Sequence, residues 1–435
     1  MDNDPAFSAA PPPDVKQPLW PRLKDVMGPG LITGASDDDP SGIATYSQVG
    51  AQFGYGMGWT LLFSYPLMCA IQQVSAQIGR VTGRGLAGNL RQHASPWLLY
   101  AVVGLLLAAN TINIGADLGA MAAALHLLVG GPSLPYVGLF AVTSVLLEVF
   151  VRYTRYVSVL KWLTLSLLAY VATVFVVDVS WGEVLRQLVL PEVSWSGEML
   201  TAVVAVLGTT ISPYLFFWQA GEEVEAEREQ PASHPLKVAP EQAPAELHRI
   251  RIDTYLGMGI SNLVALFIVI TTAATLHSHG TTTIETSAQA AEALRPIAGR
   301  FAFTVFALGI IGTGLLALPV LAGSAAYALG EARRWKVGLA QKPDRAPAFY
   351  ITIAVATAVG ALINLTPIDP VRALFWTAVI NGVVAVPVMA AMLLLAARPA
   401  VMGEFTLRWP LRAVGWLATV VMAAATAAMV ATWGK

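Results

Sequence analysis

Long apolar stretches alternate with short polar connections along most of this chain. The hydrocarbon core of a bilayer is about 30 Å thick, so an α-helix needs about 20 apolar residues to cross it. We identify about eleven such stretches. They occupy roughly residues 26–55, 57–79, 97–128, 134–153, 155–178, 197–221, 253–277, 301–330, 347–365, 369–397 and 410–433. The pattern predicts an all-α polytopic membrane protein with about 11 transmembrane helices.

Two of these stretches are interrupted by residues that a continuous membrane helix excludes. The first contains three consecutive acids, Asp37, Asp38 and Asp39, followed by Pro40, and the sixth contains Pro213 after a polar run. Proline ends or kinks a helix because it lacks an N–H and clashes with the preceding turn. Acids and non-helical backbone persist at membrane depth only where protein or water surrounds them. Both breaks therefore indicate a functional site.

The spacing of the two breaks predicts an internal repeat. Five spans separate their starting points, as in a fold of two five-helix inverted repeats (5+5, LeuT-like) with broken helices 1 and 6 and an extra eleventh helix. The transmembrane transporter domain then covers residues 23–435, with repeat one at about 23–180, repeat two at about 195–398 and the extra helix at about 408–433. The Pro-rich residues 1–22 are expected to form a disordered cytoplasmic tail.

Composition supports a membrane protein, and the distribution of charge predicts how the chain is oriented in the membrane. Hydrophobic residues make up 56% of the 435 residues and charged residues 12%, about half the charged share of a soluble domain. Most Lys and Arg residues fall in alternate connections, which places the N-terminus in the cytoplasm and the C-terminus outside. The polar segment at about 222–250 is then a cytoplasmic linker, and residues 181–190 and 286–297 are interfacial helices on the outer face. We expect an integral protein of the plasma membrane, the inner membrane in bacteria.

Several functions are disfavoured because the sequence lacks the residues or motifs that they require. The single cysteine, Cys69, excludes an intramolecular disulfide and a cysteine-cluster metal site. The sequence contains no phosphate-binding P-loop motif, so pumping by ATP hydrolysis on this chain is disfavoured. We expect no enzyme activity, no cofactor and no nucleic-acid partner. The lipid bilayer is the expected surrounding, and no protein partner is evidently required.

Short motifs at the two breaks carry a family resemblance. The first span has Gly28-Pro-Gly30 followed by Asp39-Pro-Ser-Gly42, the third has Ala116-Asp-Leu118, and the sixth has Ser212-Pro-Tyr214. These segments resemble the Nramp family of divalent-metal transporters, whose motifs there are Gly-Pro-Gly, Asp-Pro-Gly-Asn, Asp-Leu and Met-Pro-His. The resemblance is dense over the first three spans, clear at the sixth, and limited to topology from the eighth onward.

The resemblance implies a metal site between the breaks, built from the family's Asp, Asn and Met side chains and from backbone carbonyls. Here Asp39 is retained, Gly42 stands for the Asn, Ser212 stands for the Met, and carbonyls near Ser36 and Thr209 remain. Oxygen donors alone favour Mg²⁺ or Mn²⁺, as in the family's magnesium-transporting branch, and the small residues would leave room for bound water. The predicted metal site is Asp39, Asp38, Ser36, Ser41, Gly42, Thr209 and Ser212.

Most residues that the family links to proton movement are absent. Asp117 remains in the third span, but Ala120 and Asn110 stand where further acids are expected, and Tyr214 stands for the family's His. The ninth span also lacks the family's paired Arg. We therefore expect metal import without proton coupling, driven by the membrane potential. Asp117, Asn110, Tyr214 and Asn381 are placed on the transport pathway; alternatively, Asp117 and the Asn side chains are structural and hydrogen-bond between helices.

An alternative function stays open at this point. A transporter of the same fold could carry a small organic solute, such as an amino acid. Asp39 would then bind a coupling cation or the amine of the substrate, and Tyr214 and Phe216 would line the substrate pocket. Stabilisation of the purified protein by divalent salts, or by amino acids with sodium, separates the two functions.

Overall fold

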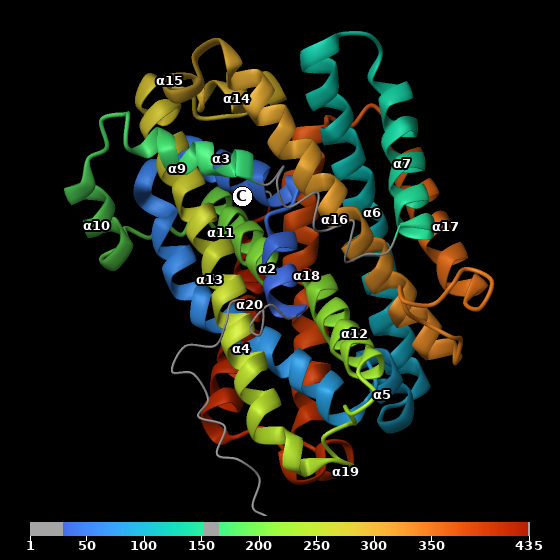
Figure 1. Ribbon diagram of the computed structural model, residues 1–435. Helices are drawn as coiled ribbons and strands as arrows, with labels where there is room; N and C mark the ends of the chain where they lie inside the picture. The colour runs from blue at the N-terminus through green and yellow to red at the C-terminus, as the bar shows by residue number, and fades with distance from the viewer. Residues whose placement is uncertain (1–28, 152–164, 434–435) are drawn as a thin grey trace, which may run out of the picture.

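The structure, a computed structural model, describes residues 29–151 and 165–433 (Figure 1). The tail predicted over 1–22 and part of the fifth predicted span lie outside the described residues. Within the described ranges the chain is helical and has no strand. The α-helices are α2 (Pro29–Asp37), α3 (Pro40–Phe53), α4 (Gly58–Thr82), α5 (Leu86–His93), α6 (Pro96–Val129), α7 (Ser133–Phe150), α9 (Leu168–Val174), α10 (Trp181–Val189), α11 (Gly197–Thr210), α12 (Pro213–Glu229), α13 (Ala243–Thr275), α14 (Ser287–Glu292), α15 (Arg295–Ala298), α16 (Ala302–Arg333), α17 (Pro347–Ile363), α18 (Pro370–Ala396), α19 (Pro399–Met402) and α20 (Trp409–Thr432).

These helices confirm the predicted all-α class. Seven helical segments in the described part of the chain are long and apolar enough to cross a membrane. The first span is split into α2 and α3 and the sixth into α11 and α12, as the two breaks predict. The short helices α10, α14 and α15 lie where interfacial helices are expected. The count of eleven stays a prediction, because residues 152–164 lie outside the described ranges.

The broken helices lie inside a layer of longer ones (Figure 1). α13 packs along α2, α3 and α4, whereas α6 packs against α16, α17 and α18. α11 lies against α3, α18 and α20. Helices from both halves of the chain therefore surround the two breaks, which is the position that unpaired backbone groups need in a membrane.

Two glycine pairs bring the broken helices into backbone contact with their neighbours. A Cβ on Gly34 would lie 2.3 Å from the carbonyl carbon of Gly257, and a Cβ on Gly208 would lie 2.4 Å from the nitrogen of Gly382. A residue larger than glycine at position 34 would push α2 away from α13, and one at position 208 would push α11 away from α18. Small residues serve this purpose in membrane bundles, where close packing holds helices together in place of the hydrophobic effect.

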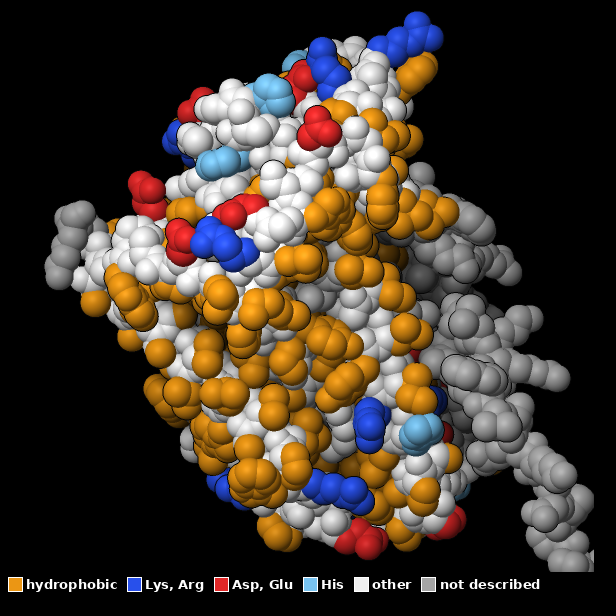
Figure 2. Space-filling model, turned by 90° about the vertical axis from the view of Figure 1, so that its left-hand side faces the viewer, with side chains coloured by type: hydrophobic (Ala, Val, Ile, Leu, Met, Phe, Trp, Pro, Cys, Tyr) orange, Lys and Arg blue, Asp and Glu red, His pale blue; other side chains and the backbone are white. Residues whose placement is uncertain are grey.

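The outer surface is apolar around the middle of the bundle. Figure 2 shows hydrophobic side chains over the middle of one face, with most charged side chains near its two ends. Phe63 on α4, Leu263 on α13 and Val355 on α17 are all more than half exposed. A soluble protein rarely exposes apolar surface on this scale, so the surface suits contact with lipid.

The prediction of a solvated linker at about 222–250 is wrong. α12 continues to Glu229 and α13 begins at Ala243, so most of this segment is helical. Glu223 and Glu227 are buried, because each of them meets an arginine from a neighbouring helix. The acidic run therefore belongs to the packed end of the bundle.

A buried ion-pair network joins α4, α12 and α13 at this end. Arg80 on α4 lies 3.6 Å from Glu227 and 3.2 Å from Glu246. Arg249 on α13 lies 2.5 Å from Glu223 and 3.1 Å from Glu246. Removing one member of such a network leaves its buried partner unpaired, which is strongly destabilising.

Replacing Arg80 with methionine should therefore destabilise the protein. The substitution leaves Glu227 without a cation and Glu246 with one fewer, and breaking a buried pair costs about 3–5 kcal/mol. We expect a marked drop in the melting temperature of the detergent-solubilised Arg80→Met protein. Arg251→Met, which removes an exposed arginine from α13, is the control. Equal melting temperatures for the two variants would contradict this role of the network.

Candidate functional site

The first break places Asp39 between α2 and α3 in an extended conformation, with φ of −71° and ψ of 171°. Pro40 begins α3, where its missing N–H has no helical partner to lose. The Oδ1 atom of Asp39 accepts a hydrogen bond of 2.7 Å from the backbone nitrogen of Gly42 and so caps α3. A carboxylate also suits the positive end of the helix dipole. Local chain geometry therefore fixes the position of this acid.

The second break places Ser212 between α11 and α12, and Pro213 begins α12. The Ser212 hydroxyl does not cap the new helix. Its Oγ lies 2.8 Å from the carbonyl oxygen of Gly208 and 2.9 Å from that of Thr209 and donates toward both. Ser212 thus contacts carbonyl oxygens that the end of α11 leaves without N–H partners.

The two breaks meet at Asp39. Its Oδ2 atom accepts from the hydroxyl of Tyr214 at 3.2 Å and from the Nδ2 of Asn113 at 3.4 Å. Tyr214 lies in the first turn of α12 and Asn113 lies in α6, so one carboxylate connects α3 with two other helices. A Cβ on Gly42 would lie 3.1 Å from the methyl carbon of Thr209, so α3 also touches α11. Predicted residues from both breaks therefore lie side by side.

Asp37 and Asp38 contact a different helix. The Ser261 hydroxyl of α13 lies 2.7 Å from Oδ2 of Asp37 and 3.1 Å from Oδ1 of Asp38. The described residues contain no group of three or more His, Cys, Asp or Glu side chains that could hold a metal ion. Asp38 shares Ser261 with Asp37, whereas Asp39 contacts Tyr214 and Asn113, so the structure does not place these acids together as one cluster of ligands.

Helix α6 carries Asn110, Asn113 and Asp117 on one face, since residues three and four positions apart are neighbours on a helix. The Asn110 amide donates to the carbonyl of Leu321 and to the hydroxyl of Ser324, both at 2.8 Å, and so ties α6 to α16. This contact is the structural role named as the alternative for Asn110. Both carboxylate oxygens of Asp117 are buried without a hydrogen-bond partner in the described part of the chain.

No basic side chain among the described residues compensates these acids. Asp37, Asp38, Asp39 and Asp117 are at most 6% exposed. Within residues 29–151 and 165–433, none of the four forms an ion pair with Lys, Arg or His. Burying a carboxylate is costly unless a cation or several hydrogen bonds compensate it. This arrangement suits a cation that arrives from solution.

The remaining predicted residues are buried close to the breaks or in a helix that packs on them. Ser36 lies in the last turn of α2, whose carbonyls lack helical partners, and Ser41 lies in the first turn of α3. Asn381 is buried in α18, which packs on α11, and its Oδ1 has no hydrogen-bond partner among the described residues. Gly42 leaves less room for water than expected, because the Thr209 methyl group fills the space beside it.

Sequence reasoning does not single out several polar residues that hold α2 and the acids in place. Thr33 donates to the Oε1 of Gln219 at 2.6 Å, and Gln72 donates to the carbonyl of Leu215 at 2.9 Å. Ser261, the partner of two acids, is another. The available signal was a polar side chain within an apolar span, which is typical of contacts between membrane helices.

The four acids are buried in this structure. A cavity of about 20 Å³ lies beside Ile43 and Ser47 of α3 and Ala120 of α6. A volume of this size holds about one water molecule. None of the four acids is among the residues that line it.

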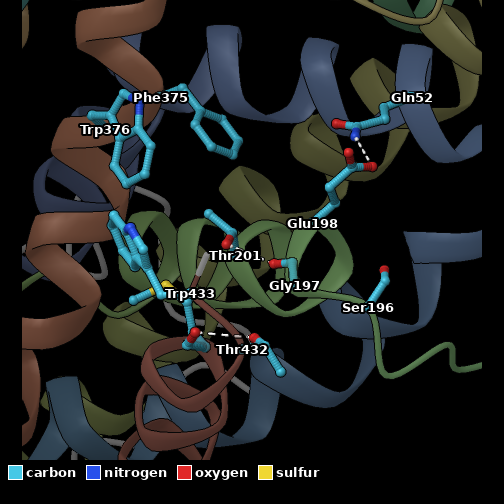
Figure 3. Close-up of a pocket in the computed structure, with 10 residues that line it drawn as sticks. Gln52, Ser196, Gly197, Glu198, Thr201, Phe375, Trp376, Thr432 and Trp433 are labelled. Carbon is cyan, nitrogen blue, oxygen red and sulfur yellow. Dashed lines mark hydrogen bonds between the residues drawn. The ribbon is translucent and has the colours of Figure 1, made fainter. Parts of the chain in front are cut away.

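A larger hollow, of about 550 Å³, lies away from these acids (Figure 3). Gln52 and Glu198 form a hydrogen bond on one side of it, and Trp376 and Trp433 lie on the other. The residues that line it include none of the predicted site residues. Its tryptophans suit the interface between membrane and water.

Comparison with known families agrees with this geometry. A family model described as Nramp, natural resistance-associated macrophage protein-like, matches residues 30–432. The chain belongs to the Nramp family. Nramp proteins are membrane transporters and not enzymes, which confirms that prediction.

Individual relatives and a solved structure also match nearly the whole chain. The divalent metal cation transporter MntH of Burkholderia ambifaria is 26% identical over 425 residues, which cover 94% of this chain and 89% of the relative. The protein of the same name from Klebsiella pneumoniae (strain 342) is 24% identical over 408 residues, 91% of each chain. The structure of the Eremococcus coleocola manganese transporter matches with a TM-score of 0.71 at 17% identity, covering 94% of this chain and 86% of that one.

A second structural likeness supports the wider fold. Mhp1, a nucleobase-cation-symport-1 family transporter, matches with a TM-score of 0.56 at 14% identity over 94% of both chains. Together with the split helices, these likenesses confirm the LeuT-like fold predicted from the spacing of the breaks.

Placing the Nramp family's asparagine at position 42 should destabilise this chain unless Thr209 is shortened. Gly42→Asn would bring a Cβ to 3.1 Å from the Thr209 methyl carbon, and overpacking costs about 1–3 kcal/mol. We expect a lower melting temperature for Gly42→Asn and recovery in Gly42→Asn/Thr209→Ala, with Thr209→Ala as the single control. Purely additive effects in this double-mutant cycle would show that the two residues do not interact.

Proposed function

We propose that this protein carries a divalent metal cation across the membrane into the cytoplasm, with Asp39 as the central ligand. The observation that carries the proposal is the buried carboxylate of Asp39, which lies at the meeting point of two broken helices without a basic partner among the described residues. Broken helices release carbonyls, and carbonyl and carboxylate oxygens are the usual ligands of hard cations. The names of the MntH relatives and of the manganese transporter support the same class of substrate.

We infer a preference for Mg²⁺ or Mn²⁺ from the donor atoms. Asp39 and the hydroxyl of Tyr214 supply oxygens at the meeting point, and carbonyls of Ser36 and Thr209 are the proposed backbone ligands. Ser212 contributes a hydroxyl at the position of the family's Met. Oxygen ligands favour magnesium and manganese, whereas thioether ligands favour softer ions. Asp38, Ser41 and Gly42 stay in the proposal as neighbours of Asp39.

The proposed cycle needs no proton. Asp117 is the one residue of the family's proton path that the chain keeps, so we propose potential-driven entry without proton coupling. The potential contributes about 2.3 kcal/mol per charge for each 100 mV, and twice that for a divalent ion. The metal is the substrate, and no cofactor or partner is part of the proposal. The N-terminus is cytoplasmic and the C-terminus outside, in the plasma membrane, or the inner membrane of a bacterium.

The alternative of an organic solute finds less support. Tyr214 donates to Asp39, and both Tyr214 and Phe216 are buried in the described structure. A buried tyrosine whose hydroxyl donates to the acid fits an ion site better than an open solute pocket.

Removing the charge of Asp39 should abolish metal uptake. Asp39→Asn keeps the shape and much of the hydrogen bonding but loses the central anionic ligand. Changes in the outer shell of a metal site already cost 10–100-fold, so we expect the initial rate in proteoliposomes to fall by about 100-fold or more. Asp344→Asn, an exposed acid, is the control. Normal uptake by a correctly folded Asp39→Asn protein would refute the assignment.

Metal entry should leave the pH inside the vesicles unchanged. We expect uptake into proteoliposomes to rise with an inside-negative potential, while a pH-sensitive dye inside them shows no metal-dependent acidification. An Asp117→Asn variant provides the comparison. Acidification that follows metal entry and disappears in Asp117→Asn would show that this single acid carries protons.

A further inference from the structure

Six basic side chains gather around a hollow of about 660 Å³ at the end of the bundle that holds α5, away from α14 and α15 (Figure 1). The hollow lies between α5, the C-terminal ends of α12 and α16, and the segment that follows α16. We call it the basic pocket. Its basic residues are Arg84, Arg91, Arg228, Arg334, Lys336 and Arg345.

These cations outnumber the carboxylates that line the hollow, where Glu331 is the acid and acts electrostatically on Arg91 and Arg228. None of the six lies within ion-pair distance of a carboxylate in the described part of the chain. The acid in the pocket lining, Glu331, is already engaged with backbone: it accepts from the nitrogens of Gly85 at 2.8 Å and Gly88 at 2.9 Å. A concave surface on which positive charges predominate concentrates anions. The pocket therefore favours an anion from outside the chain.

One of the arginine side chains is held in place before any ligand arrives, and a second arginine has an unusual backbone conformation. The Nη1 of Arg91 donates to the carbonyl of Glu331 at 2.7 Å, while its Nε is buried without a partner among the described residues. Arg334 has a φ of 63°, the one positive φ of a non-glycine residue in the described chain. It stands at the end of α16, where the nitrogen of Trp335 donates to the carbonyl of Gly330 at 2.8 Å. Glycine normally occupies such a position, so an arginine there points to a role for its charge.

We propose that the basic pocket binds an anion that carries one or more phosphate groups and at least two negative charges. Guanidinium groups present paired N–H donors that match phosphate oxygens, and the volume lies in the range of small-molecule sites. Two sources share this chemistry: the headgroup of an acidic phospholipid, and a soluble polyphosphate such as a nucleotide. The pocket shares no residue with the acids at the helix breaks, so the proposal is independent of the transported ion.

The test compares two double variants with the same change in charge. Lys336→Gln/Arg345→Gln removes two exposed cations from the basic pocket. Arg408→Gln/Arg412→Gln removes two exposed cations at the start of α20, outside the pocket, and is the control. Both are made in the full chain, and their melting temperatures are compared with that of the unmodified protein. Arg334→Asn, which tolerates a positive φ, is a further pocket variant.

Two probes identify the source of the phosphate. Calorimetric titration of delipidated protein with tripolyphosphate and ATP tests a soluble ligand. Native mass spectrometry of protein from phosphatidylcholine bilayers that contain cardiolipin or phosphatidic acid tests a lipid. We expect binding of one class by the unmodified protein and the control, at least tenfold weaker binding by both pocket variants, and further weakening as salt is raised. Equal binding by pocket variants and control, or no binding of either class by the unmodified protein, would overturn the proposal.

Discussion

Asp39 caps helix α3 and also links α3 to helices α12 and α6. Its Oδ1 caps α3 through Gly42, and its Oδ2 accepts hydrogen bonds from Tyr214 on α12 and Asn113 on α6. The cap requires a break in the first span, and the contact with Tyr214 requires a break in the sixth. A carboxylate in this position has no basic partner within the described ranges, so both the fold and the proposed cation site depend on how its charge is balanced.

The described structure is closed around that carboxylate. α2 is held along its length, since Gly30 donates to Asp253 at 2.6 Å and Thr33 donates to Gln219 at 2.6 Å. The cavity beside α3 holds about one water. Because Asp39 is buried, an ion can reach it from solution only after the surrounding helices separate. The short, broken helices suit such movement, because a half-helix can tilt without disrupting the long helices that surround it.

Much of the fold could be predicted from the sequence because apolar length, prolines and buried acids have direct consequences in a membrane. The division of the first and sixth spans follows from Pro40 and Pro213. The partners of the acids could not be predicted: Ser261 lies more than 200 positions from Asp37, and many other polar residues were equally available. Glu223 and Glu227 were assigned to a solvated linker for the same reason, since Arg80 and Arg249 meet them only in the folded bundle.

One feature near the breaks bears on ion preference. The sulfur of Met121, one turn beyond Asp117 on α6, packs against Gly314 of α16, close to the ring of Pro40. A thioether ligand would favour softer ions such as Cd²⁺, whereas oxygen ligands favour Mg²⁺ and Mn²⁺. The most direct test of a hard-ion site is competition among Mg²⁺, Mn²⁺ and Cd²⁺ for uptake into proteoliposomes at a clamped potential. The account predicts that Mg²⁺ or Mn²⁺ competes at least tenfold better than Cd²⁺, a difference of about 1.4 kcal/mol. A strong preference for Cd²⁺ that is lost in Met121→Ala would contradict it and assign the sulfur as a ligand.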